Sequence, residues 1–230
     1  SLYGLIAIGY TMVYGILRLI NFAHGEVFML GAYFVFFGIS LFHLPWGVAV
    51  IGSIAVSSLC GIFVDRIAYK PLRSAPRISA LISAIGVSFL IQNLAIVIFG
   101  GIPRPVARPD WLVQVMKVGE VRIIPLAIVV PLVTLALVLG LLWIVYRTKP
   151  GLAMRAISKD IETTRLMGVS VNKIIAFTFG LGSALAAASG IMWALRYPQI
   201  QPFMGLVPGL KAFIAAVFGG IGSIQGAVIG

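Results

Sequence analysis

Three polar side chains stand close together in an otherwise apolar stretch, INFAHGEVFM, residues 20–29. His24 and Glu26 are spaced like the H-x-E of zinc deaminases, where a histidine binds zinc and a glutamate transfers protons. That chemistry also needs a P-C-x-x-C pair, and Cys60 is the single cysteine of the chain. On a helix, residues two apart do not face each other. Asn21, His24 and Glu26 are therefore expected to form neither a catalytic site nor a metal site.

The composition indicates which elements must hold these side chains. Hydrophobic residues make up 60% of the chain and charged residues 10%, whereas soluble domains carry about 25% charged residues. Several continuous apolar runs can cross a hydrocarbon core of about 30 Å, and a transmembrane barrel would show short alternating segments instead. We predict an all-α, polytopic transmembrane helical bundle. The expected spans are Leu2–Ile20, Val27–Leu44, Trp46–Val64, Ile78–Phe99, Ile123–Tyr146, Ile174–Leu195 and Pro208–Gly230.

The basic residues predict an orientation. The loops 65–77 and 147–173 lie two spans apart and together hold ten of the 17 Lys and Arg residues. Because positive charge accumulates in cytoplasmic loops, both loops are expected on the cytoplasmic side. This distribution also accounts for the net charge of +11 without nucleic acid. The loop 100–122, rich in proline and glycine, is expected to be external and extended.

Polar side chains inside a span are costly and usually face the bundle interior or a pathway. For Gln92 and Asn93, contacts between helices and lining of a pathway are equal alternatives. Lys211 can instead extend to the membrane interface. Ser88 shares a helical face with Gln92. Serines inside a span, Ser88 included, are nevertheless expected to bond to the backbone of their own helix. The candidate pathway residues are Asn21, His24, Glu26, Gln92, Asn93 and Lys211.

Two interpretations of the segment 20–29 remain open. The flanking spans permit a turn at the cytoplasmic edge of the membrane. They also permit a broken helix inside the bundle, where Gly25 lets backbone groups face a cavity. We favour the break beside a pathway.

The loop 147–171 contains a helical pattern. Pro150 and Gly151 are expected to end the preceding helix. From Ala153 to Met167 one amphipathic helix is expected, because Met154, Ile157 and Ile161 would share a face. The helix could lie in the lipid interface or dock into another subunit. The small residue Gly168 near its end favours docking.

Small residues indicate close helix packing in the last two spans. The sequence GGIGSIQG fails the dinucleotide fingerprint, because Gln225 stands at the third glycine position. A G-x-x-x-x-G-K-[ST] loop is also missing from the sequence, so ATP would have to be hydrolysed on another chain. Residues four apart can instead form packing faces. The expected packing residues are Gly182, Ala186, Gly190, Gly222, Gly226 and Gly230.

Several sequence blocks carry a family resemblance. RAISKDIETTRLMGV (155–169) resembles the coupling loop in permease subunits of branched-chain amino acid ABC importers, with Thr164 where that family usually has alanine. Four further blocks are similar to the same family: AIGYTMVYGILRLINFAHGE (7–26), DRIAYKPLR (65–73), LISAIGVSFLIQN (81–93) and LKAFIAAVFGGIGSIQGAVIG (210–230). The resemblance implies contacts with an ATPase subunit at Arg155, Ala156, Asp160, Thr164 and Gly168.

This resemblance implies a transport subunit, not an enzyme. Residues 1–230 are expected to be one permease domain, truncated at both ends, in a bacterial or archaeal cytoplasmic membrane. The implied partners are a second homologous permease, two ATPase subunits and an extracytoplasmic solute-binding protein. No cofactor is expected in this chain, because ATP and Mg would bind the ATPase subunits. The alternatives are a urea or amide ABC importer, a proton-coupled carrier using Glu26 or His24, and a scaffold that transports nothing.

Overall fold

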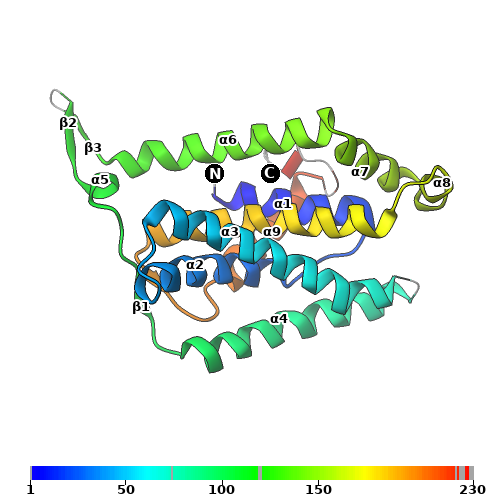
Figure 1. Ribbon diagram of the computed structural model, residues 1–230, viewed down its shortest axis with the longest axis horizontal. Coiled ribbons are helices and arrows are strands. Elements are labelled where there is room, and N and C mark those ends of the chain that lie inside the picture. The colour runs from blue at the N-terminus through cyan, green and yellow to red at the C-terminus, as the bar shows by residue number, and fades with distance from the viewer. Residues whose placement is uncertain (1, 74, 119–120, 221, 223–225, 228–230) are drawn as a thin grey trace.

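The computed structural model describes residues 2–73, 75–118, 121–220, 222, 226 and 227. Its long helices lie side by side along one axis (Figure 1), as predicted for an all-α bundle. Each of the seven expected spans overlaps one of these helices. They are α1 (Leu2–Leu17), α2 (His24–Ser40), α3 (Trp46–Val64), α4 (Arg77–Phe99), α6 (Pro125–Arg147), α9 (Val171–Arg196) and α10 (Leu206–Phe218).

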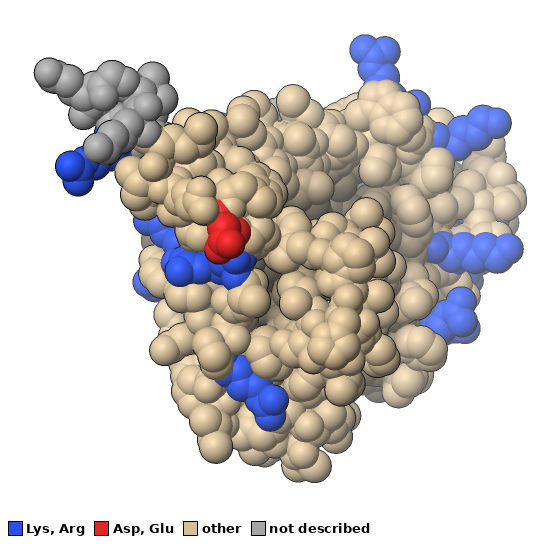
Figure 2. Space-filling model, turned by 60° about the vertical axis from the view of Figure 1, so that its left-hand side comes forward, with Lys and Arg blue, Asp and Glu red and all other residues tan. Residues whose placement is uncertain are grey.

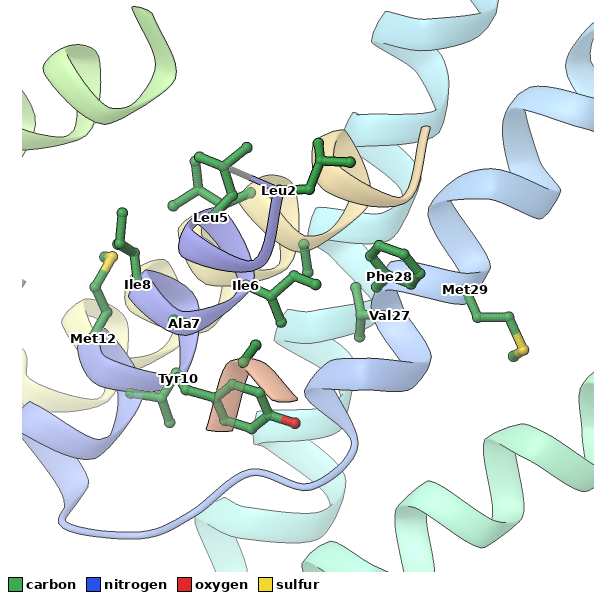
Figure 3. Close-up of a cluster of buried hydrophobic side chains, with 14 of the residues drawn as sticks. Leu2, Leu5, Ile6, Ala7, Ile8, Tyr10, Met12, Val27, Phe28 and Met29 are labelled. Atoms are coloured by element: carbon green, nitrogen blue, oxygen red, sulfur yellow. The ribbon is translucent and has the colours of Figure 1, made fainter. Parts of the chain in front are cut away.

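Helix α9 lies at the centre of the bundle and packs against α1, α2 and α3. Small residues permit this packing, because a Cβ at Gly190 would overlap the backbone oxygen of Phe28 in α2. Gly182 in turn lies against the backbone of Gly9 in α1. Figure 3 shows buried apolar side chains of α1 and α2 that belong to the core.

Four described stretches are long and apolar enough to cross a membrane by length and composition. These are Trp46–Leu72, Ile78–Phe99, Pro125–Arg147 and Val171–Arg196. The first joins α3 to a π-helical turn, η1 (Asp65–Tyr69), and a 3-10 turn, η2 (Lys70–Leu72). Unlike α9, the helices α3, α4 and α6 leave most of their apolar side chains exposed or half-buried, as expected of helices that face lipid or other subunits.

Short strands gather at one end of the bundle, at the left in Figure 1. Strand β1 (Arg104–Pro105) pairs with β4 (Gln199–Ile200), and β2 (Met116–Val118) pairs with β3 (Val121–Ile123), both antiparallel. With α5 (Asp110–Val113), they give local structure to a loop that was expected to be extended. Figure 2, with this end turned forward, shows a largely uncharged surface with small groups of Lys and Arg side chains.

The opposite end carries two short helices, α7 (Lys149–Lys159) and α8 (Ile161–Leu166). The prediction of one amphipathic helix over Ala153–Met167 was therefore wrong. Asp160 leaves the helical conformation at φ −154° and caps α8, accepting hydrogen bonds from the Glu162 and Thr163 backbones at 2.9 and 3.1 Å. Met154 and Ile157 are buried as expected, but the break at Asp160 leaves Ile161 exposed.

The final span also differs from its prediction. Helix α10 ends at Phe218, and turns follow in which Gly220 and Gly222 have φ values of +92° and +101°. Side chains other than glycine rarely adopt this conformation, so the chain leaves the helix there. Gly222 and Gly226 therefore do not continue a packing face of α10, and Gly230 lies outside the described residues. Gly222 lies against the backbone of Gly15 in α1, and a Cβ at Gly219 would overlap the Gly226 oxygen.

Candidate transport site

The connection from α1 to α2 turns back into the bundle. Helix α1 ends at Leu17, and residues 18–23 return alongside it until α2 begins at His24 (Figures 1 and 3). The His24 ring fills the space in front of Gly9, in the middle of α1, and lies near Gly182 in the middle of α9. The structure thus places the helix break inside the bundle, the interpretation that the sequence favoured. Its role in a pathway stays a prediction.

Glu26 is the centre of a buried polar cluster. Its side chain is 2% exposed, and Oε1 accepts hydrogen bonds from Gln92 Nε2 at 2.6 Å and Ser88 Oγ at 3.1 Å. Gln92 also donates to Ser88 Oγ at 3.3 Å. Ser88 therefore does not bond to its own helix as expected, because α4 presents both side chains to the first turn of α2. Among the described residues, Glu26 Oε2 has no hydrogen-bond partner.

His24 and Tyr10 pack edge to face beside this cluster. Their ring centroids lie 4.8 Å apart at an interplanar angle of 61°. Figure 3 shows Tyr10 reaching from α1 toward a turn of α10, where Phe213 lies 6.0 Å from it, centroid to centroid. His24 is 1% exposed and its Nε2 has no hydrogen-bond partner in the described part of the chain. The imidazole is therefore held mainly by packing between α1 and α9.

Asn21 connects the helix break to the end of the bundle that carries α7 and α8. Its Oδ1 accepts a hydrogen bond at 2.7 Å from the hydroxyl of Tyr69, a buried residue of η1. At the other end of η1, Asp65 pairs with Arg73 at 2.5 Å, and Arg73 donates to Asn172 Oδ1 at 2.5 Å. A chain of contacts thus runs from the start of α9, through η1, to the segment before α2.

A small cavity lies where α2 and α10 begin. It has a volume of about 70 Å³. Gly25, Gly205 and Gly209 bring the two backbones together there, since a Cβ at Gly209 would lie 3.1 Å from Gly25 Cα. Tyr10 and Glu26 also line the cavity, and Glu26 is the one charged residue among its described lining. About 10–15 Å³ of such space holds one water molecule, so the cavity has room for a few waters or a small polar group.

Two of the predicted pathway residues lie away from this cluster. Asn93 is exposed on α4 and donates to the Phe89 oxygen of its own helix at 2.7 Å. Lys211 is exposed on α10, with Nζ 5.8 Å from the ring centroid of Tyr3. The bundle therefore brings together Asn21, His24, Glu26 and Gln92 from the predicted set.

The packing and coupling candidates occupy separate places. Gly182, Ala186 and Gly190 are buried along α9, where Gly182 and Gly190 lie against α1 and α2. At the other end, Thr164 is buried and donates to the Asp160 oxygen at 2.6 Å. Gly168 follows α8 with φ +81°. The remaining two are Arg155, exposed and 5.4 Å from the ring centroid of Tyr146, and Ala156, half-buried.

Sequence reasoning missed Tyr10, Tyr69 and the Asp65–Arg73 pair. Asp65, Tyr69 and Arg73 recur every four residues within DRIAYKPLR, a spacing that could have marked one helical face. Tyr10 gave no such signal, because its partners come from distant segments. The described residues contain no group of three or more His, Cys, Asp or Glu side chains that could hold a metal ion.

Comparison with known proteins identifies the family. Residues 1–230 match the family described as the permease component of branched-chain amino acid transport systems. The chain belongs to this family. Among its relatives, the high-affinity branched-chain amino acid permease LivH of Salmonella typhimurium is 41% identical, and BraD of Pseudomonas aeruginosa is 43% identical. Each alignment covers 100% of this chain and 78% of the relative.

A more distant relative is also similar over nearly the whole permease. The probable branched-chain amino acid permease LivH of Methanocaldococcus jannaschii is 26% identical over 98% of this chain and 72% of its own length. No solved structure matches the chain. Membership in this family and the four membrane-crossing stretches make the chain a multi-pass membrane permease.

The permease exposes apolar side chains at the end that carries α7 and α8. Leu166 and Met167, at the end of α8 opposite its cap Asp160, are 87% and 79% exposed. Hydrogen bonds from the Thr163 side chain and backbone hold the pKa of Asp160 below its usual value. The carboxylate is therefore charged at neutral pH, the form in which it caps α8.

Proposed function

We propose that the chain is the permease subunit of an ATP-driven importer for branched-chain or related small amino acids in a cytoplasmic membrane. The match to the permease family over residues 1–230 carries this proposal. The names of the relatives that are 41–43% identical support the substrate class. A second permease, two ATPase subunits with ATP and Mg, and an extracytoplasmic binding protein complete the proposed transporter.

The proposed transport mechanism is alternating access. Helices α2 and α10 begin next to each other inside the bundle, and broken helices of this kind supply backbone groups to substrates near the membrane centre. A cavity of about 70 Å³ lies at this point, and Glu26 lines it. Movement of the bundle there would open a path, which Asn21, His24, Glu26 and Gln92 would line.

The movement is proposed to enter through α7 and α8. Met154 and Ile157 anchor α7 to the bundle, whereas Leu166 and Met167 remain exposed for a partner. An ATPase subunit that binds this surface would move α8 and the start of α9. Asn172, Arg73 and Tyr69 would carry that movement to Asn21.

Substrate competition tests the proposal. The complete transporter would be placed in proteoliposomes with ATP inside and binding protein outside, and uptake of labelled leucine measured with unlabelled leucine, urea or glutamine in excess. We expect unlabelled leucine to compete, and urea and glutamine to leave uptake unchanged. Competition by urea, or no leucine uptake by the complete complex, would contradict the proposed substrate class.

A further inference from the structure

We propose that Glu26 Oε2 and the adjoining cavity form a binding site for the ammonium group of the transported amino acid. This inference rests on the proposed function and deepens it, because it names the part of the substrate that the permease recognises. The single observation behind it is a buried carboxylate oxygen that has no partner among the described residues and belongs to a cavity-lining side chain.

The hydrogen bonds of Glu26 leave one of its two oxygens without a donor. Gln92 and Ser88 both donate to Oε1, which fixes the carboxylate in place. Oε2 remains buried and unpartnered in the described structure. A buried carboxylate oxygen without a donor is costly, so a ligand that brings N–H donors and positive charge would remove that cost.

The residues that line the cavity favour a positively charged group. Among the described lining residues, no Lys or Arg competes for Glu26, and the aromatic side chains of Tyr10 and Phe22 are present. Aromatic rings attract cations as well as apolar groups. The volume of about 70 Å³ has room for an ammonium group beside Glu26.

The rest of the substrate would lie at the mouth of the cavity. Leu206 and Leu210 of α10 belong to the lining and are 43% and 47% exposed, so the cavity opens between apolar side chains. An aliphatic amine fits this arrangement of one anionic oxygen followed by an apolar surface. A neutral molecule such as urea brings no charge for Glu26.

Thermal stability of the purified complete transporter in nanodiscs, without binding protein, tests this site. The probes are leucine, isopentylamine, which keeps the ammonium, 4-methylpentanoate, which keeps the carboxylate, and potassium chloride against choline chloride. We expect leucine and isopentylamine to raise the melting temperature and 4-methylpentanoate to leave it unchanged. No response to isopentylamine, or a response to potassium chloride alone, would overturn the assignment.

Substitutions at Glu26 test whether this residue is responsible for the stabilisation by amines. Glu26→Gln should weaken the apparent affinity for isopentylamine at least about tenfold, as expected when a charged hydrogen bond is lost. Glu26→Asp keeps the charge and should keep the preference for amine over carboxylate. Asp110→Asn makes the same chemical change on the exposed start of α5 and should respond like the wild type. Equal responses of wild type and Glu26→Gln would refute the site.

The two proposals can fail separately. If the wild-type complex imports leucine but its stability ignores isopentylamine, the ammonium site is wrong and the proposed function stands. If the complete wild-type complex imports no amino acid, the proposed function is wrong.

Discussion

Replacing Gly190 by alanine tests the packing that places α2 inside the bundle. An ideal Cβ at Gly190 would overlap the carbonyl oxygen of Phe28 and lie 2.9 Å from its carbonyl carbon. Both atoms belong to the backbone of α2, so no side-chain rotation relieves the overlap. The helix that carries His24 and Glu26 would have to move away from α9.

The expected cost is at the upper end of what overpacking produces. Extra methylene groups in a packed core cost about 1–3 kcal/mol of folding free energy. Because the overlapping partner here is rigid backbone, we expect a cost of about 3 kcal/mol. A loss of about 3 kcal/mol lowers the melting temperature of a domain of 150–250 residues by about 6–12 °C. Uptake should fall with stability, because the cluster around Glu26 depends on the position of α2.

Thermal unfolding of the purified complex measures this effect against a matched control. Gly140 lies in α6, where an added Cβ would meet no other atom within 4 Å, so Gly140→Ala adds the same methyl group in open space. Alanine is favoured over glycine in helices by about 0.5–1 kcal/mol, so this variant should be as stable as the wild type or more stable. Equal melting temperatures for Gly190→Ala and Gly140→Ala would refute the reasoning.

Three further predictions concern η1 and the end of the bundle that carries α7 and α8. Tyr69→Phe should cost about 1–3 kcal/mol, because it leaves the buried Asn21 oxygen without its donor, and a double-mutant cycle with Asn21→Ala should be non-additive in thermal unfolding. Asp160→Ala should increase hydrogen exchange in α8, because the helix loses its cap. In the wild type, acidification through the lowered pKa of Asp160 should also increase this exchange, since protonation removes the charged cap. Unchanged exchange would count against the cap. Gly168→Arg should preserve ATP hydrolysis but abolish uptake. Gly168→Asn should retain transport, because asparagine tolerates the φ of +81° at this position. Normal uptake by the arginine variant would refute the coupling role.

The helices could be predicted from the sequence because local apolar runs determine them. Seven spans are expected, and each overlaps a helix. The i, i+4 spacing of Ser88 and Gln92 also predicted a shared face. Their common partner, Glu26, could not be predicted, because it depends on residues 18–23 turning back into the bundle.

The wrong predictions arose where the periodic spacing of residues was given more weight than a local signal. Asp160 is a favoured N-cap residue, but the apolar spacing of Met154, Ile157 and Ile161 concealed the break. In the last span the four-residue glycine repeat resembled a packing face, whereas Gly222 adopts a positive φ in a turn. Glycine serves both close packing and tight turns, so its spacing alone does not distinguish them.

The dependence of leucine uptake on the ATPase subunits tests the central claim most directly. Proteoliposomes would contain the complete complex, the same complex without ATPase subunits, or this chain alone under a pH gradient. A permease subunit of an ATP-driven importer should accumulate leucine in the first case and in neither of the others. Uptake by this chain alone under the pH gradient would contradict the account and identify a proton-coupled carrier.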